Sequence, residues 1–117
     1  MAQQLLVDLY GCDPDALNDA ERVASVARDI VHRVGSSIVE ELSHQFDPIG
    51  VTYIAVITTS HISIHTWPEF GYVALDVFSC AEDVPEAIVM AAVRAFGASE
   101  RRVRSAERTV GRTPNAL

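Results

Sequence analysis

The order of apolar and polar residues along the chain predicts six strands and two helices. The expected strands are short runs rich in Val, Ile and aromatic residues, bounded by Gly, Pro and Asp. They cover residues 4–10, 36–46, 51–58, 62–66, 72–78 and 101–110. Residues 47–50 and 67–71 contain turn-forming residues and are expected to join strand pairs as hairpin-type connections.

Two stretches have the spacing of amphipathic helices. In the first, the apolar residues that share one helical face are Val23, Ala27, Ile30, Val31 and Val34. Asn18, with Glu21 three positions later, is the expected cap, and Gly35 is expected to end this helix. The second helix is expected to begin at the cap Asp83 and to stop at Gly97.

The predicted order, β-α-β-β-β-β-α-β, determines the expected fold class. Helices separated by hairpins favour an antiparallel sheet. We therefore expect an α+β two-layer sandwich, in which two helices cover one face of the sheet. Because no linker or internal repeat divides the chain, residues 1–117 are expected to form a single domain.

The charge of the chain is distributed unevenly. The net charge is −7, yet residues 90–117 carry six arginines against two glutamates, which leaves about −11 for residues 1–89. A basic tail can bind nucleic acid, but this one has no interleaved aromatics and belongs to an acidic chain. We interpret it as a solvated edge strand and tail, and expect no nucleic-acid partner.

The sequence lacks the patterns that direct a protein to a membrane. Its N-terminus starts with polar residues and a strand-like run, so no signal peptide is visible. The longest apolar stretch, residues 84–96, contains Glu86 and Arg94 and is too short to cross a bilayer. Two cysteines are too few for a disulfide framework. We expect a cytoplasmic protein with no membrane partner.

Lysine is absent from the chain, and this excludes one class of amino-acid chemistry. Pyridoxal-phosphate enzymes hold their cofactor as a Schiff base on a lysine. Any carbonyl that serves as an electron sink here has to come from another source.

Residues 59–80 concentrate hydroxyl, imidazole, carboxylate, thiol and aromatic groups. In a strand, His61 and His65 would lie about 13 Å apart, too far to share one ion, so we expect no metal site. Cys80 and His65 could form a nucleophile pair, although a lone cysteine after an apolar strand is more often a buried small hydrophobe. Trp67 and Phe46 are compatible with ordinary core packing or an interface.

The same segment resembles a known processing signature. The cleavage-site motif of short bacterial S-adenosylmethionine decarboxylase proenzymes is matched by Ser60-His61-x-Ser63-x-His65-Thr66-Trp67-Pro68-Glu69-x-Gly71-Tyr72. Residues 5–12, 44–51 and 74–80 are similar to the opening strand, the central hairpin and the strand after the signature in that family. These segments occur in the family's order, so the resemblance covers nearly the whole domain.

The resemblance implies self-cleavage between Thr59 and Ser60 into residues 1–59, the beta chain, and 60–117, the alpha chain. In the family, the serine matching Ser60 attacks the preceding carbonyl, and elimination and hydrolysis then leave a pyruvoyl group on the new end. The pyruvate cofactor would thus come from Ser60, which accords with the missing lysine. By resemblance, His65 is the base for the Ser60 α-proton and Thr52 supports processing.

The resemblance also implies what the cleaved protein does. The family decarboxylates S-adenosylmethionine, and the product is the aminopropyl donor for spermidine synthesis. Cys80 matches the proton donor, Phe46 and Trp67 match residues that flank adenine, and Glu69 matches the residue that holds the ribose hydroxyls. An aromatic wall also favours a sulfonium cation. A dimer of processed protomers, with paired sheets and sites near the interface, is expected.

Departures from the family pattern keep other functions open. Thr59 stands where the family usually has glutamate, and this raises the alternative of an uncleaved, non-catalytic regulatory relative. Glu40 and Glu41 replace a polar uncharged pair, and carboxylates near the site would suit a diamino acid such as ornithine or arginine. Adjacent side chains in a strand face opposite ways, however, so at most one of the two can face the pocket.

Overall fold

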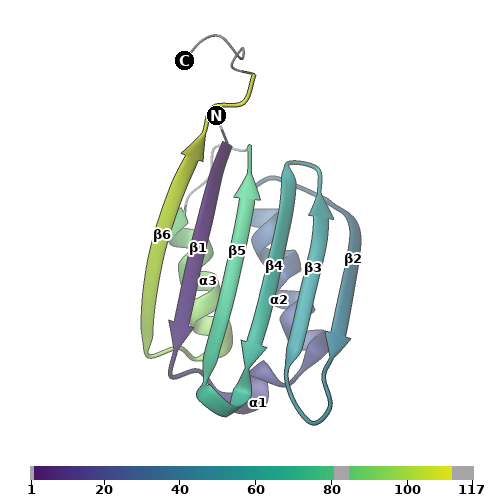
Figure 1. Cartoon of the computed structure of the whole chain (residues 1–117), viewed down its shortest axis with the longest axis vertical. Coiled ribbons are helices and arrows are strands. Elements are labelled where there is room, and N and C mark those ends of the chain that lie inside the picture. Colours follow the sequence, from purple (N-terminus) through teal and green to yellow (C-terminus); the bar gives the residue numbers. More distant parts are fainter. Residues whose placement is uncertain (1, 81–84, 112–117) are drawn as a thin grey trace.

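A six-stranded antiparallel sheet forms the centre of the protein (Figure 1). The computed structural model describes residues 2–80 and 85–111. The strands are β1 Ala2–Tyr10, β2 Ile38–Gln45, β3 Val51–Ile57, β4 Ser60–Trp67, β5 Tyr72–Ser79 and β6 Glu100–Arg108. Their order across the sheet is β2-β3-β4-β5-β1-β6, and every neighbouring pair is antiparallel. β1 is therefore inserted between β5 and β6.

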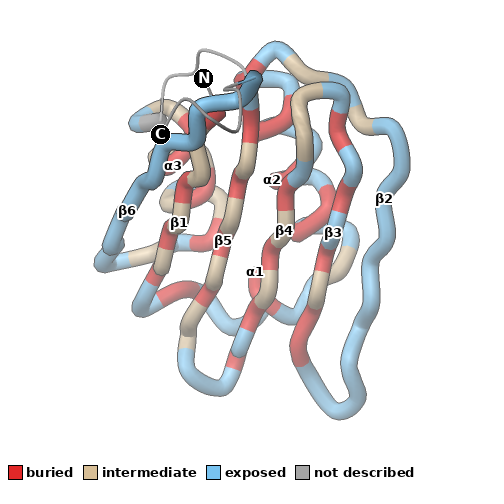
Figure 2. The backbone as a smooth tube through the Cα atoms, turned by 45° about the horizontal axis from the view of Figure 1, so that its top comes forward, coloured by how far each residue is buried: buried red, intermediate tan, exposed pale blue. Residues whose placement is uncertain are grey.

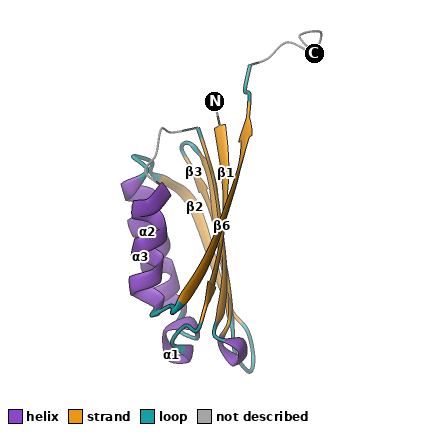
Figure 3. Ribbon diagram, turned by 90° about the vertical axis from the view of Figure 1, so that its left-hand side faces the viewer, coloured by secondary structure: helices purple, strands orange, loops and turns teal. Residues whose placement is uncertain are grey.

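The long helices of the described chain cover only one face of this sheet. These helices, α2 Ala20–Arg33 and α3 Pro85–Phe96, lie on the same face, as the edge-on view in Figure 3 shows, and they are neighbours behind the sheet in Figure 1. The short helix α1 Pro14–Leu17 and the 3-10 turn η1 Pro68–Phe70 lie at one end of the sheet. The predicted α+β two-layer sandwich is thus confirmed. In the described ranges, no helix is long and apolar enough to cross a membrane.

The core lies between the sheet and the helices. The apolar face predicted for the first helix is confirmed, because its five residues are all buried: Val23, Ala27, Ile30, Val31 and Val34. On β3, β4 and β5, buried and more exposed residues alternate (Figure 2). The buried set faces the helices, and the alternate set lies on the opposite side, which we call the open face.

The start of α2 differs from the prediction. Asp19, rather than Asn18, is the cap, because its side chain accepts a hydrogen bond from the backbone N–H of Arg22 at 3.1 Å. Asn18 Oδ1 instead accepts hydrogen bonds from the backbone N–H of Gly50, at 3.0 Å, and from the Gln45 amide, at 2.9 Å. A tertiary contact to the β2–β3 connection therefore takes the side chain that local spacing assigned to the helix.

The other element boundaries shift by a few residues. Residues 14–17, for which the sequence predicted no helix, form α1. β4 is longer than expected, since it begins at Ser60 and extends to Trp67. Gly35 and Gly97 follow the two long helices with φ of 69° and 66°, as predicted for glycines at helix ends. The expected cap Asp83 lies outside the described residues.

The arginine-rich segment near the C-terminus forms the edge strand β6, which is exposed along its whole length (Figure 2). Arg104 forms an ion pair with Asp8 of β1 at 3.1 Å, and Arg101 forms one with Glu86 of α3 at 2.7 Å. The interpretation of this segment as a solvated edge strand is confirmed.

Candidate active site

The residues singled out in the sequence lie at two opposite ends of the central strands. The β3–β4 turn and the end of β5 meet at the top of Figure 1, and this cleavage end carries Ser60 and Cys80. The β2–β3 and β4–β5 connections meet at the bottom, and this aromatic end carries Phe46, Trp67 and Glu69. The candidate site therefore has two separate parts.

At the cleavage end, Thr58 and Thr59 form a two-residue turn, on either side of which Ile57 pairs with Ser60. Such turns usually need positive φ at their central residues, which β-branched threonines disfavour. The positive φ falls instead on Ser60, at 150°, and no other described residue except glycine has one. A side-chain-bearing residue held in this region stores about 1–3 kcal/mol of strain.

The carbonyl group before Ser60 is held by the end of β5. The backbone N–H of Cys80 donates a hydrogen bond to the Thr59 carbonyl oxygen at 3.1 Å. A fixed donor at this distance also stabilises negative charge that develops on the same oxygen. The strained residue therefore directly follows a carbonyl group whose oxygen has a fixed hydrogen-bond donor.

Hydroxyl side chains surround Thr59, and sequence reasoning missed two of them, Ser36 and Ser79. The Ser79 hydroxyl donates to Thr59 Oγ1 at 3.0 Å. Thr59 Oγ1 donates to Ser36 Oγ at 3.0 Å, and the Thr59 backbone N–H donates to the same oxygen at 3.2 Å. Ser36 lies 23 residues before Thr59, so only the fold brings the two together.

At the aromatic end, a cavity of about 350 Å³ opens on the surface. It is lined by Phe46, Asp47, Ile49, Gly50, Thr52, His65, Thr66, Trp67 and Glu69. Its volume lies within the range of about 300–1,000 Å³ that is usual for small-molecule sites. Phe46 is 47% exposed and Trp67 is 39% exposed, so both rings are accessible to a ligand. Five of the residues singled out in the sequence thus share this cavity.

Two threonines fix the wall of the cavity. Thr52 Oγ1 forms a hydrogen bond with His65 Nδ1 at 2.9 Å across the β3–β4 pair, which orients the imidazole ring. Thr66 is buried, and its hydroxyl donates to the Leu17 carbonyl at 2.7 Å and accepts from the Val51 N–H at 2.9 Å. The Thr66 side chain therefore ties β4 to α1 and to the start of β3.

An aromatic row continues from the cavity across the open face. The ring centroids of Trp67 and Tyr72 are 5.3 Å apart, and those of Tyr72 and Tyr10 are 5.4 Å apart. The Tyr72 hydroxyl donates to the Asp8 carboxylate, and burial together with this hydrogen bond raises the pKa of Tyr72 to about 12. At neutral pH Tyr72 is therefore a protonated hydrogen-bond donor.

Asp76 lies on the open face between the two ends, opposite Ser63 of β4. Burial raises the pKa of Asp76, whereas His65 and His61 act on it in the opposite direction. When ionised, this carboxylate adds negative potential midway along the open face, which suits a cationic ligand. Within the described residues, no group of three or more His, Cys, Asp or Glu could hold a metal ion.

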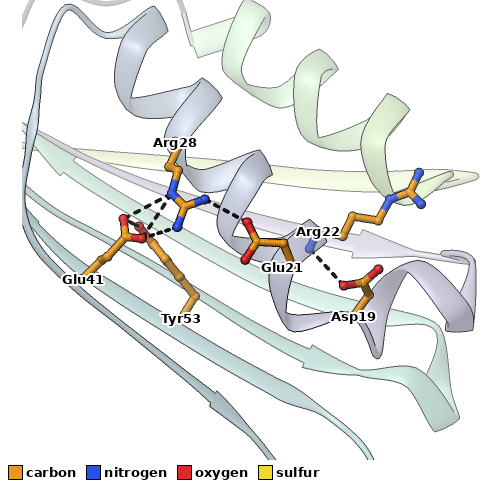
Figure 4. Close-up of polar contacts among 6 residues, drawn as sticks. All are labelled: Asp19, Glu21, Arg22, Arg28, Glu41 and Tyr53. Atoms are coloured by element: carbon orange, nitrogen blue, oxygen red, sulfur yellow. Dashed lines mark hydrogen bonds and ion pairs between the residues drawn. The ribbon is translucent and has the colours of Figure 1, made fainter.

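The adjacent acids on β2 face opposite ways. Figure 4 shows Glu41 on the helix side, where it accepts hydrogen bonds from Arg28 of α2 and, at 3.0 Å, from the Tyr53 hydroxyl. These contacts, above all the one with Arg28, lower the pKa of Glu41. Glu40 lies on the open face opposite Val56 of β3. Neither carboxylate lines the cavity at the aromatic end.

The two ends do not form one site within a single chain. Ser60 and His65 are five residues apart on β4, which separates their Cα atoms by roughly 16 Å at about 3.3 Å per residue. A proton transfer needs the two groups within about 3 Å or one bridging water. Within one chain, His65 therefore does not reach Ser60. Cys80, in contrast, lies beside the Thr59–Ser60 peptide bond, because its backbone N–H binds the Thr59 carbonyl.

Fold and site together define a small two-layer α+β protein, with a strained serine and an exposed thiol at one end of the sheet and a cavity of ligand size at the other. The comparison with known sequences gives the family. Residues 3–109 match S-adenosylmethionine decarboxylase, and the chain belongs to this family. The family resemblance drawn from the processing signature and its flanking segments is thus confirmed.

Individual relatives agree with this membership. The chain is 40% identical over 96 residues to the S-adenosylmethionine decarboxylase proenzyme of Methanococcus aeolicus, and the match covers 82% of each protein. It is 37% identical over 97 residues to that of Thermodesulfovibrio yellowstonii, which covers 82% of this chain and 72% of the relative. The solved adenosylmethionine decarboxylase of Aquifex aeolicus superposes with a TM-score of 0.83 at 28% identity, covering 94% of this chain and 92% of that one.

Proposed function

We propose that this chain is a proenzyme that cleaves itself between Thr59 and Ser60 and then decarboxylates S-adenosylmethionine. The observation that carries the proposal is the backbone at this bond. Ser60 has a φ of 150° and directly follows a carbonyl that accepts a hydrogen bond from the Cys80 N–H. The names of the relatives, which are S-adenosylmethionine decarboxylase proenzymes, support the same activity.

In the first step, the Ser60 hydroxyl oxygen attacks the Thr59 carbonyl carbon. Negative charge develops on the Thr59 oxygen, beside the Cys80 N–H. The peptide C–N bond then breaks, the hydroxyl proton is transferred to the nitrogen, and the amide becomes an ester. Breaking this bond releases the strain at Ser60, so the strained backbone favours the forward direction.

In the second step, a base removes the α-proton of Ser60. The electron pair of that C–H bond forms a Cα–Cβ double bond, the Cβ–O bond breaks, and Thr59 leaves as a carboxylate. Water then displaces the nitrogen as ammonia, and residue 60 becomes the pyruvoyl group, without any oxidant or reductant. We assign the role of base to His65, whose ring is oriented by Thr52.

A pyruvoyl group at residue 60 would supply a carbonyl that can bind the substrate amine and act as the electron sink for loss of carbon dioxide. The surroundings of residue 60 fit this group, because the half-buried start of β4 lies beside the exposed thiol of Cys80. We assign to Cys80 the return of a proton to the substrate α-carbon. Phe46 and Trp67 are assigned to the adenine ring and Glu69 to the ribose hydroxyls. The product would be the aminopropyl donor for spermidine synthesis.

A complete site requires two copies of the chain. Since roughly 16 Å separates Ser60 from His65, the cleavage end of one protomer has to meet the aromatic end of another. Two open faces packed around a twofold axis would bring opposite ends together twice, and none of the described helices blocks this face. Exposed apolar side chains, Leu42, Ile54 and Val56, lie on it. We therefore propose a dimer with two shared sites.

Mass spectrometry of the purified protein tests the processing. The expected result is two chains, residues 1–59 and 60–117, the second without a free amine, while Ser60→Ala remains one full-length chain. An intact wild-type mass after prolonged incubation would show an uncleaved relative instead. Carbon dioxide release from S-adenosylmethionine, ornithine and arginine, measured side by side, then tests the substrate. Faster release from either diamino acid would leave the cleavage standing and overturn the substrate.

Co-expression of two inactive variants tests the shared site. In a mixed dimer, a Ser60→Ala chain supplies an intact His65, and a His65→Ala chain supplies an intact Ser60. The His65→Ala chain should therefore yield the two fragments only when the Ser60→Ala chain is present. If it remains uncut in the mixture while the wild type is processed, the two residues do not act across the dimer.

A further inference from the structure

The Ser36 hydroxyl contacts the residue before the cleavage point twice. It accepts a hydrogen bond from the Thr59 backbone N–H at 3.2 Å and another from Thr59 Oγ1 at 3.0 Å. Ser36 lies between α2 and β2 and belongs to neither the signature segment nor the cavity. We propose that Ser36 is a positioning residue for self-cleavage, an inference that rests on the processing proposed above.

The directions of the hydrogen bonds follow from the number of protons available. A serine hydroxyl has one proton and two lone pairs, and Thr59 occupies both lone pairs of Ser36. The Ser36 proton is therefore donated to Thr58 Oγ1, at 2.9 Å. Thr59 Oγ1, whose proton is donated to Ser36, accepts from Ser79 at 3.0 Å. The hydroxyls thus form one directed chain, from Ser79 through Thr59 and Ser36 to Thr58.

Ser36 is itself held by the end of α2. Its backbone N–H donates to the Val31 carbonyl at 3.1 Å, and the Gly35 N–H donates to the His32 carbonyl at 3.0 Å. Gly35 has a φ of 69°, which turns the chain sharply as the helix ends. The Ser36 hydroxyl is therefore fixed relative to a packed helix rather than to the turn that it contacts.

Together these contacts hold Thr59 at three atoms. Ser36 holds the backbone N–H and the side-chain hydroxyl, while the Cys80 N–H holds the carbonyl oxygen. With both sides of the residue fixed, the plane of the Thr59–Ser60 peptide keeps one orientation toward the attacking hydroxyl. Small displacements from such an orientation slow an intramolecular reaction strongly. After cleavage, Thr59 is the end of the first fragment, so Ser36 should affect maturation and not turnover.

A time course of cleavage after synthesis of the full chain by in vitro translation tests this role. Ser36→Ala should cleave about tenfold more slowly than the wild type, because two hydrogen bonds to Thr59 are lost. Ser37→Ala is the matched control and should cleave at the wild-type rate, since Ser37 is exposed and contacts Thr58 through its backbone N–H. Ser36→Thr, which keeps the hydroxyl, should recover most of the rate.

Turnover separates positioning from a general loss of structure. Once fully cleaved, Ser36→Ala should release carbon dioxide from S-adenosylmethionine at the wild-type rate per cleaved chain. A loss of turnover equal to the loss of cleavage rate would instead indicate damage to the whole fold and would overturn the proposal. If the wild type and Ser36→Ala were cleaved at the same rate, the positioning role of Ser36 would also be overturned. If the wild type were not cleaved at all, the proposed processing itself would be refuted.

Thr59→Val provides a second test that leaves Ser36 in place. It removes only the hydroxyl that links Ser79 to Ser36, and it too should slow cleavage by several fold. In the double variant Ser36→Ala/Thr59→Val, the two effects should be less than multiplicative, because both substitutions remove the same hydroxyl–hydroxyl contact. Fully multiplicative effects, or wild-type cleavage by Thr59→Val, would contradict the directed chain.

Discussion

Replacement of Glu41 by methionine should destabilise the protein in a pH-dependent way. Glu41 joins the edge strand β2 to the helix layer, since its carboxylate accepts hydrogen bonds from Arg28 of α2 and from the Tyr53 hydroxyl (Figure 4). Methionine has a similar length but replaces neither hydrogen bond. We expect Glu41→Met to keep the fold and to lower the free energy of unfolding.

The size of the effect follows mainly from one of the two contacts. Tyr53 is fully buried, and a hydrogen bond from its hydroxyl to a charged acceptor contributes about 1.5–3 kcal/mol. The Arg28 pair is accessible to water, with side chains 47% and 28% exposed, so it adds little. We therefore expect a loss of about 2 kcal/mol. At about 2.1 cal/mol/K of unfolding entropy per residue, 117 residues convert this loss into a Tm decrease of about 8 °C.

The pH dependence has a definite sign. The hydrogen bonds from Arg28 and Tyr53 lower the pKa of Glu41 in the folded protein, despite the opposing effect of burial. Its stabilising contribution is therefore complete above the unfolded pKa of about 4.3 and is lost as the pH falls through the lower folded value. The destabilisation caused by Glu41→Met should consequently be largest near neutral pH and should shrink in acid.

Urea unfolding measures this difference in chains that carry Ser60→Ala, which keeps every sample as one uncut polypeptide at one protein concentration. The difference between the parent and Glu41→Met should be about 2 kcal/mol at pH 7 and should shrink below about pH 4. Glu21→Gln is the control and should change little, because Glu21 is 81% exposed although it contacts the same arginine. An equal difference at neutral and acid pH, or none at neutral pH, would refute the reasoning.

Three further predictions concern the site. Trp67→Ala should weaken S-adenosylmethionine binding about ten- to a hundredfold, seen as a higher KM in fully cleaved protein, and an unchanged KM would remove Trp67 from the adenine site. Thr66→Val should cost about 2–3 kcal/mol in urea unfolding, because it removes the buried hydroxyl that binds the Val51 N–H and the Leu17 carbonyl, and a loss below about 0.5 kcal/mol would contradict this. Burial raises the pKa of Cys12 to about 11, so a thiol reagent at mildly alkaline pH should label the exposed Cys80 and spare Cys12 until the protein unfolds. Equal labelling of both thiols would contradict that burial.

Much of the fold could be predicted because its signals are local. Prolines and glycines mark the hairpins, and the helical spacing from Val23 to Val34 identifies the buried face of α2. Helix α1 was missed because four residues are too few to show a period. The choice of Asn18 as cap was wrong because a partner 32 residues away, Gly50, binds its side chain.

The candidate site was harder to predict, since its geometry depends on contacts between distant segments. Ser60 and His65 look adjacent in the sequence, yet an extended strand places them roughly 16 Å apart. Ser36 has no motif of its own and reaches Thr59 only because α2 ends beside the β3–β4 turn. The residues of the aromatic end, in contrast, do share one cavity, because two neighbouring connections bring Phe46 and Trp67 together.

The strand order has a consequence for the two fragments that cleavage would produce. The first fragment would contain β1, β2 and β3, and the second would contain β4, β5 and β6. In the sheet, β1 lies between β5 and β6, and β3 lies against β4, so three of the five strand pairings join one fragment to the other. Strands of the two fragments are thus neighbours at three places in the same sheet. They should remain associated without any covalent link, and neither could complete the sheet by itself.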